Sequence, residues 1–463
     1  MKSLITGLAV LFAFVCAVSC RKTSFIESAD ALINTSSDTL RFDTVFTTTG
    51  SITKSFKIFN LNDQKLRLSN VKLMGGAASA FKLNVDGTPG VNFNNIEIEP
   101  NDSVYVFVSV TINQNSANLP FIIQDSILVN YNGNNRYVQL EAFGQNAIFL
   151  RNTRITRNTT WNNNLPYVIL GGVLVDSGAS LTINKGCRIY VHADAPVIIN
   201  GSLKVNGEKD DSTRVIFQGD RLDEPYRNFP GSWPGIYFSP SSNNNVLNYA
   251  IVKNAYQGII TQLPATDGNF KVTLTQCILD NIYDAGILSI SSSVKAVNCL
   301  ISNCGSNIAI GSGGRYDFNY CTVASYGNSY LAHKLPVLYV SNANDQGQPI
   351  SLTATFRNCI FWAEGGIVDN EIVIDKRVTA STITFENTLY KAKDDITASA
   401  TFINSKKNYP PQFDSIDVSK RYFNFHLQNT SPAKDSGSLN FPELIDLDGN
   451  PRTGLPDIGC YNK

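Results

Sequence analysis

The chain has 463 residues, and its 38 lysines and arginines are balanced by 38 aspartates and glutamates. This length accommodates two or three domains, and the neutral balance gives no support for a nucleic-acid partner or for electrostatic attraction to an anionic membrane. Only 16% of residues are charged, while asparagine, serine, threonine and glycine are plentiful, which favours short strands and turns over long helices.

The first 20 residues have the pattern of an export signal. Lys2 precedes an apolar run from Leu4 to Val18, and a small-residue segment ends at Cys20. The segment resembles a bacterial lipoprotein signal, which implies cleavage before Cys20, lipidation of its thiol and membrane anchoring through acyl chains. A plain secretory signal is the alternative. By the same resemblance, Arg21 implies an outer-membrane lipoprotein that faces the periplasm or the outside.

A polar tether is predicted for 21–37, and a first β-domain for 38–147. The domain shows period-2 alternation broken by turns, and it has no cysteine or tryptophan. It resembles the immunoglobulin-like (Ig-like) modules of bacterial surface lipoproteins, which implies a β-sandwich that serves as a spacer or docking surface. The seven predicted strands are 53–60, 66–73, 81–85, 95–99, 103–112, 125–131 and 137–144.

A repeat with a basic step of 22 residues occupies the second body, which is predicted to begin at about Pro166. Very short strand segments alternate with glycine, asparagine and aspartate turns, and no helical pattern separates them. One slot of the repeat holds Ala250, Cys277, Cys299, Cys321, Cys359 and Thr388. Apolar residues recur three positions before the slot and two positions after it, and Asn254, Asn281 and Asn303 recur four positions after it. Such a period is typical of a solenoid.

Strand-only coils of this length predict a parallel β-helix, in which equivalent residues of successive coils stack in columns. The slot then becomes an interior column of packed, free thiols, since buried cysteine behaves as a small hydrophobic residue. Metal sites need cysteines that converge on one point, and disulfides need opposed Cβ vectors, whereas these cysteines lie a full coil apart. Cys299 with Cys304 is the pairing left open as a disulfide. The asparagines are expected to form a column of hydrogen-bonded amides.

The segment 166–430 resembles the right-handed parallel β-helix proteins of the pectate-lyase-like superfamily. The chain end, "LIDLDGNPRTGLPDIGCYNK", is similar to the end of exported bacterial β-helix proteins. We expect 431–463 to be a cap over the unpaired strands of the last coil. Calcium binding by Asp446 and Asp448 is an alternative, although the other ligands of an EF-hand loop are missing. No other cofactor is predicted.

Catalysis has little support in the sequence. A hydrolase or lyase on this fold needs carboxylates on neighbouring coils, and the acids at Asp280 and Asp284 are followed one coil later by Ser302 and Ser306. The best remaining cluster is an acidic loop, which is more often simply solvated. Its catalytic candidates are Asp220, Arg221, Asp223 and Glu224.

Binding is the preferred interpretation. Insertions at 218–246, 262–270, 326–350 and 364–380 would wall a groove if they emerged at one corner, and aromatic faces suit sugar rings. The candidate ligand-binding residues, which could instead pack beneath the loops, are Trp233, Tyr237, Tyr326, Tyr330 and Trp362. We therefore expect a lipid-anchored, monomeric, all-β protein that binds a glycan or a surface protein without catalysis. The alternatives are a polysaccharide lyase or glycoside hydrolase in the groove, and a purely structural envelope component.

Overall fold

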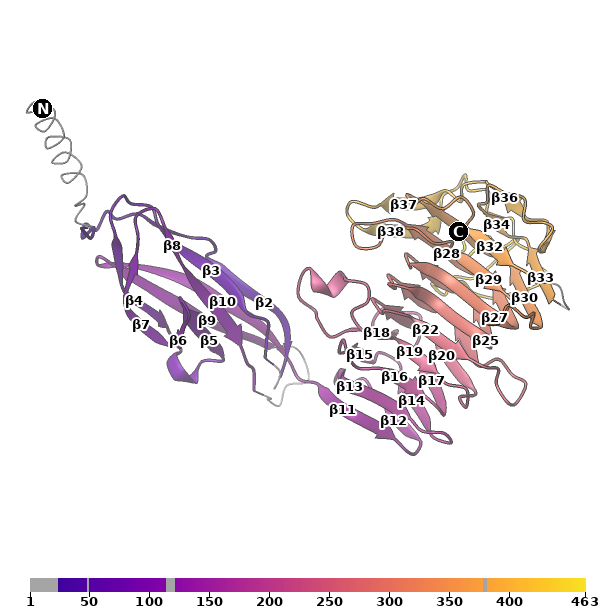
Figure 1. The fold of residues 1–463 in the computed structure, drawn as a ribbon, viewed down its shortest axis with the longest axis horizontal. Coiled ribbons are helices and arrows are strands. Elements are labelled where there is room, and N and C mark those ends of the chain that lie inside the picture. Colours follow the sequence, from indigo (N-terminus) through magenta and orange to yellow (C-terminus); the bar gives the residue numbers. More distant parts are fainter. Residues whose placement is uncertain (1–23, 48–49, 114–120, 378–380) are drawn as a thin grey trace, which may run out of the picture. The chain divides into compact units, whose positions relative to one another are not determined.

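The computed structural model describes residues 24–47, 50–113, 121–377 and 381–463. Over these residues the chain is all-β apart from two short 3₁₀ turns, Gly76–Ala78 and Tyr226–Asn228. It divides into two compact units, Met1–Asn146 and Ala147–Lys463 (Figure 1). The predicted lipidation site, Cys20, lies outside the described residues.

Two five-stranded sheets make up the first unit, and one hydrophobic core contains residues of both. Because inward and outward residues alternate along each strand, the longer strands each contribute one apolar face to this core. In spatial order the first sheet is β1 (Ile33–Thr35), β3 (Lys54–Asn60), β8 (Ser103–Val110), β5 (Phe81–Val85) and β6 (Thr88–Gly90). The second is β2 (Thr39–Phe46), β10 (Asn134–Gln145), β9 (Phe121–Tyr131), β4 (Leu66–Leu73) and β7 (Asn92–Ile98).

The predicted tether is wrong for its described part. Phe25 forms a β-bridge with Lys65, and β1 pairs with β3 in antiparallel register. Ala31 is buried in the core of the first unit. The polar composition of 24–37 made the segment look like a linker, yet Ile26 and Ile33 pack against the same core as Ala31.

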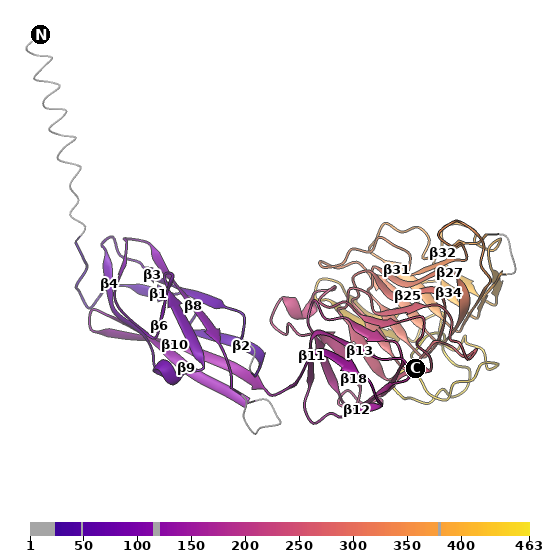
Figure 2. The ribbon, with the colours of Figure 1, turned by 60° about the horizontal axis from the view of Figure 1, so that its bottom comes forward.

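The second unit is built on one continuous sheet of 26 strands, in which strands of successive coils pair in parallel. This is the arrangement of a β-helix, and the coils can be followed in Figures 1 and 2. The register separates the strands into three walls. Wall 1, which carries the candidate site, contains β15 (Arg188–Val191), β18 (Val215–Gly219), β21 (Ala250–Lys253), β24 (Ile278–Asp280), β26 (Leu300–Ser302), β28 (Thr322–Tyr326), β31 (Ile360–Glu364), β34 (Leu389–Tyr390) and β36 (Lys406–Lys407).

The other two walls complete each coil. Wall 2 contains β16 (Val197–Ile199), β19 (Ile236–Phe238), β22 (Ile259–Gln262), β29 (Leu338–Ser341) and β32 (Ile372–Asp375). Wall 3 contains β12 (Thr159–Trp161), β14 (Ser180–Asn184), β17 (Ser202–Asn206), β20 (Asn245–Asn248), β23 (Val272–Thr275), β30 (Leu352–Arg357), β33 (Ser381–Glu386) and β35 (Thr401–Ile403). Four long strands continue from one wall into the next: β11 (Ile148–Ile155), β13 (Tyr167–Val175), β25 (Ala285–Val297) and β27 (Ser306–Asn319).

The predicted columns are confirmed. In wall 3 the register stacks Leu274, Ala296, Phe318, Phe356 and Phe385. The residue that follows each slot cysteine also stacks on its counterpart, in the column Ile278, Leu300, Thr322 and Ile360. Cys277, Cys299, Cys321 and Cys359 are buried free thiols, as are Cys187, Cys304 and Cys460, so no Cys299–Cys304 disulfide forms. Burial raises the pKa of the Cys277, Cys299 and Cys321 thiols well above the ordinary value.

Backbone conformation explains the recurring asparagines better than amide stacking does. Asn254, Asn281 and Asn303 have φ values of 61°, 56° and 52°, and asparagine is one of the few residues that adopts this left-handed region readily. The residues just before the slot share the conformation, including Asn298 and Asn358. Only the first pair of the predicted amide column forms, with Asn281 Nδ2 donating to Asn254 Oδ1 at 2.7 Å.

Two predicted boundaries of the solenoid need correction. The parallel sheet begins at β11, which pairs with β13 on both sides of a register shift, so the first coil precedes Pro166. At the other end, 431–463 does not behave as a cap on the last coil. After the hairpin of β37 (Phe413–Asp417) and β38 (Tyr422–Leu427), this tail lies along the outer face of wall 1, where Leu447, Ile458 and Cys460 share a second core with Leu300 and Ile360.

The reason lies in the outward residues of wall 1. Ile278, Leu300, Ile360 and Leu389 form an apolar outer column. Such a column needs cover, because apolar surface removed from water contributes roughly 25 cal/mol per Å². The tail supplies it, and backbone contacts fasten the tail: Cys460 N donates to Thr322 Oγ1 at 3.0 Å, and Gly459 N donates to Asn358 O at 2.8 Å.

Candidate functional site

A column of polar residues runs along the outer face of wall 1, next to the apolar column that the tail covers. The register stacks Tyr190, Gln218, Lys253, Asp280 and Ser302 on successive coils. In β21 and β24 the residues before Lys253 and Asp280 point inward and are fully buried, so these two side chains face outward. The repeat therefore places a cation and a carboxylate side by side on the surface of the solenoid.

A pocket of about 170 Å³ lies over this part of the column. Its floor belongs to wall 1 and the turns that follow its strands, and one side belongs to the β37–β38 hairpin. The lining residues are Asn228, Lys253, Asn254, Asp280, Asn281, Asn303, Asn328, Lys420, Arg421 and Phe423. Three cations and one carboxylate are among them, and the other lining residues are asparagines and a phenylalanine.

The loop between β18 and β19 forms another side of the pocket, and the asparagines of the repeat hold it there. Asn254 Nδ2 donates to Arg227 O at 2.8 Å, and Asn281 Nδ2 donates to Asn228 O at 2.9 Å. These two side chains lie at the turns that follow β21 and β24, and their amides hold the loop through hydrogen bonds to its backbone carbonyls. This gives the pocket a rigid floor and a well-held side.

An aromatic contact connects this loop to the opposite side. The rings of Phe229 and Tyr330 meet edge to face with centroids 4.8 Å apart. The guanidinium of Arg421, at the hairpin turn, lies 4.4 Å from the centroid of Tyr330, a favourable cation–π distance. The three segments around the pocket thus contact one another directly.

Two groups in the pocket have shifted pKa values with a common cause. Burial raises the pKa of Asp280, although Ser302 Oγ donates to Asp280 Oδ1 at 2.7 Å and Asn303 Nδ2 donates to it at 3.3 Å. Burial lowers the pKa of Lys253, and the nearby Asp280 works against that shift. Desolvation penalises the charged form of both groups, which is why the shifts have opposite signs.

Two of the three cations make no ion pair within the described parts of the chain, although Lys253 lies beside Asp280 in the register and is influenced by its charge. The Lys253 ammonium and the Arg421 guanidinium make no ion pair or side-chain hydrogen bond there, whereas Lys420 Nζ lies 3.3 Å from Asp417 Oδ2. Lys253 and Arg421 are only partly exposed. The pocket therefore presents an excess of positive charge in a partly desolvated setting.

The predicted catalytic acids do not line this pocket. Asp220 Oδ2 lies 2.7 Å from His192 Nδ1, and burial raises the pKa of Asp220. Arg221 makes a bidentate contact with Asp223, with both distances 2.7 Å, and Glu224 lies 3.6 Å from Arg227. These charges pair within their own neighbourhood, as expected for residues that shape a loop.

The predicted aromatic platform is largely interior. Trp233 is 1% exposed and donates its Nε1 hydrogen to Lys253 O at 2.9 Å, so it is wrong as a ligand-binding residue. Tyr326 is buried in the second core, beneath the hairpin, and is wrong for the same reason. Trp362 is also buried in that core, but it lines a separate pocket of about 430 Å³ with Asp369 and Lys391, so its role in ligand binding stays a prediction. Tyr237 is partly exposed and its hydroxyl donates to Gln262 Oε1 at 2.6 Å. Tyr330 borders the pocket through its contact with Arg421.

The insertions leave the solenoid at two corners. The segments between β18 and β19, β28 and β29, and β31 and β32 follow wall 1 and surround the polar column. The segments between β22 and β23 and between β29 and β30 follow wall 2. The expected groove is therefore bordered by three of the insertions only.

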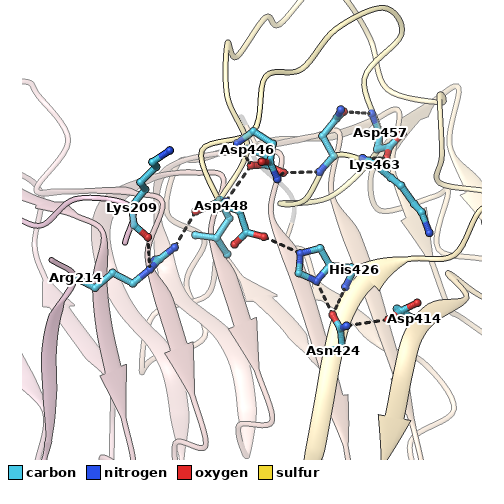
Figure 3. A network of polar contacts seen from close by, with 12 residues as sticks. Lys209, Arg214, Asp414, Asn424, His426, Asp446, Asp448, Asp457 and Lys463 are labelled. Atoms are coloured by element: carbon cyan, nitrogen blue, oxygen red, sulfur yellow. Dashed lines mark hydrogen bonds and ion pairs between the residues drawn. The ribbon is translucent and has the colours of Figure 1, made fainter. Parts of the chain in front are cut away.

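The two aspartates considered for calcium hold the tail in place (Figure 3). The Asp446 carboxylate is 0% exposed and accepts hydrogen bonds from the backbone N–H groups of Asp448, Asn450 and Asn462. Asp448 Oδ2 lies 2.7 Å from His426 Nε2. Across the described residues, no three His, Cys, Asp or Glu side chains come together as a metal site would require.

Sequence reasoning missed Lys253 and Arg421 and set Asp280 aside. A signal for two of them was present, since Lys253 and Asp280 each stand three residues after the repeat slot, at Ala250 and Cys277. The search for a column of acids did not consider a cation beside an acid. Arg421 has no such signal, because it reaches the pocket through a hairpin outside the repeat.

No family model matches this sequence, and no curated protein matches it. Among solved structures, a family 123 glycoside hydrolase from Clostridium perfringens aligns at 14% identity over 26% of this chain and 26% of its own, with a TM-score of 0.19. The catalytic unit of a thermostable GH87 alpha-1,3-glucanase from Streptomyces thermodiastaticus aligns at 10% identity over 79% of this chain and 90% of its own, also with a TM-score of 0.19. Because both TM-scores are low, the assignment of the second unit to the β-helix fold rests on its parallel strand register. None of the described helices has the length and apolar character needed to cross a membrane.

Proposed function

We propose that this protein is an exported, lipid-anchored scaffold that binds a glycan in the wall 1 pocket without cleaving it. Cys20 is the proposed anchor, in the outer membrane, with the body in the periplasm or at the cell surface. The first unit, of Ig-like type, serves as a spacer, and the second is a right-handed β-helix. We further propose that the protein acts as a monomer and needs no cofactor.

The pocket is the single observation that carries the proposal. Its amides, cations and carboxylate are the groups that hydrogen-bond sugar hydroxyls and substituents. Five of the lining residues stand on the rigid repeat: Lys253, Asn254, Asp280, Asn281 and Asn303. A floor of stacked strands places such groups at about 4.8 Å intervals, which suits a linear chain of sugar rings.

Binding without cleavage follows from the acid content of the pocket. Most glycoside hydrolases use two carboxylates, roughly 5 to 9.5 Å apart, that flank the scissile bond. Asp280 is the one carboxylate among the described residues that line the pocket. Its Oδ1 also accepts two side-chain hydrogen bonds, which suits a group that positions its neighbours.

A polysaccharide lyase or hydrolase is the second candidate, and one observation favours it. Asp280 and Lys253 are adjacent titratable groups whose pKa values are shifted toward each other, a property common at catalytic sites. On this alternative, one of the two would transfer a proton during cleavage of the chain.

Retention and turnover, measured together, separate the candidates. The full-length protein is applied to a polysaccharide panel, and bound glycan, new reducing ends and unsaturated uronate products are quantified. We expect retention of at least one glycan with no product. Product that disappears in Asp280→Asn and persists in the exposed control Asp211→Asn would establish the enzyme instead. Neither retention nor product would leave a purely structural envelope component.

A further inference from the structure

We infer that the glycan bound in the wall 1 pocket carries an anionic group, a carboxylate or a sulfate, which Lys253 and Arg421 contact together. This inference rests on the proposed function and names the class of ligand.

The charge of the lining is predominantly positive. Lys253, Lys420 and Arg421 line a pocket in which Asp280 is the one acid among the described residues. Arg227 and Arg188 add to the field, since both act on Lys253 and disfavour its charged form. The Arg188 guanidinium donates to the backbone oxygens of Gly186, Asp211 and Arg214, so no side-chain carboxylate neutralises it there.

The two key cations come from parts of the chain that have separate supports. Lys253 ends β21, and its backbone is held in the sheet beside Asp280. Arg421 lies at the turn of the β37–β38 hairpin, where its own N–H donates to Val418 O and its guanidinium lies over Tyr330. Both line one pocket and neither makes an ion pair among the described residues, where Asp280 is the neighbour of Lys253 in the sheet, so an anion between the two cations would contact both.

Leaving such cations unpaired in a partly buried pocket is costly, because a charged group loses its water without a compensating contact. A ligand anion restores that contact by charge-assisted hydrogen bonds, which are about twice as strong as neutral ones. A neutral glycan cannot do so. The pocket should therefore discriminate by charge.

Replacing Asp280 provides a test in which the affinity is expected to be kept or to rise, in contrast to the loss expected for Lys253 and Arg421. The Asp280 carboxylate would repel an anion, and the Ser302 and Asn303 side chains that donate to it would remain in place in Asp280→Asn. The asparagine variant is therefore expected to bind anionic glycans at least as tightly as the native protein. General damage to the fold would weaken binding in every variant and cannot mimic this pattern.

The experiment is a binding titration of the full-length protein with two glycan groups at low and high salt. Alginate and polygalacturonate carry carboxylates alone, dextran sulfate carries sulfates alone, and dextran, galactan and xylan are neutral. We expect retention of anionic glycans only, with the affinity reduced by about tenfold or more in Lys253→Gln and in Arg421→Gln, and reduced by added salt. Lys204→Gln, an exposed lysine on wall 3, should change the affinity less than about twofold. The carboxylate and sulfate arms identify the group.

The outcomes that contradict the inference differ from those that contradict the proposed function. Neutral glycans bound as tightly as anionic ones, or anionic binding unchanged in Lys253→Gln and Arg421→Gln, would overturn the anionic class and leave glycan binding in place. Failure of all six glycans to bind would overturn both. Thermal unfolding of each variant verifies that the loss of binding is not a loss of fold.

Discussion

Replacing Phe356 with alanine is expected to lower the free energy of unfolding of the second unit by about 3–5 kcal/mol, the usual cost of removing a fully buried aromatic ring. Phe356 is 0% exposed, and its ring stacks on Phe318 and Phe385 with centroids 5.3 and 4.8 Å apart. It also meets Phe361 edge to face at 5.4 Å. The cavity would lie at the centre of an aromatic column, where neighbouring coils hold the backbone and limit collapse.

Tryptophan fluorescence during urea denaturation measures this effect, because the three tryptophans of the chain, Trp161, Trp233 and Trp362, all belong to the second unit. Tyr409→Ala is the matched control, since Tyr409 is 58% exposed and its loss should stay within about 0.5 kcal/mol. An effect of Phe356→Ala as small as the control would mean that the aromatic column is not in the interior of the solenoid.

Replacing Asp446 with alanine is expected to detach the tail from wall 1 and to destabilise the second unit by about 3 kcal/mol or more, because buried donors without partners are expensive. Three backbone N–H groups would lose their acceptor. The loss would be felt over several coils, since Asn298 Nδ2 donates to Ile445 O and Arg214 donates to Leu447 O. Limited proteolysis should then cleave within 431–463, which the native protein resists.

Asp448→Ala is the control for this prediction and lies only two residues away. Asp448 is partly exposed and contacts a His426 side chain that is 42% exposed, so its removal should cost no more than about 1 kcal/mol. Equal effects of the two substitutions, or an intact tail in Asp446→Ala, would contradict the role assigned to the buried carboxylate.

The interior of the solenoid could be predicted from the sequence because register stacks like on like. An apolar residue in one coil lies on an apolar residue in the next, as at Ala296 and Phe318, and the 22-residue step between them appears in the sequence as a period. The positive φ values of the recurring asparagines follow the same period, although their conformational reason became visible only in the structure.

The tail and the hairpin could not be predicted in this way. Asn298 and Ile445 are 147 residues apart, and no periodic pattern connects them. Sequence reasoning placed an ordered polar tail over the end of the solenoid, where strand edges are unpaired. The hydrophobic effect instead places the tail along wall 1, where the outward column of Ile278, Leu300 and Ile360 would otherwise be exposed to water.

Only the part of the candidate site that lies on the repeat could be predicted from the sequence. Lys253 and Asp280 stand at equivalent positions of neighbouring coils, so their adjacency follows from the repeat. Arg421 and Asn228 enter the pocket from a hairpin and a loop, whose contacts with wall 1 depend on tertiary packing. Trp233 shows the converse error: an aromatic residue beside an insertion looked exposed, while its ring fills the interior and its Nε1 bonds a backbone oxygen.

Hydrogen–deuterium exchange of the full-length protein, with and without saturating glycan, tests most directly whether wall 1 carries the binding site. The account predicts slower exchange on binding in peptides that cover 250–256, 278–284 and 417–424, with little change in the strands of wall 3. Protection confined to wall 3 or to the first unit, with these three segments unaffected by a glycan that does bind, would contradict it.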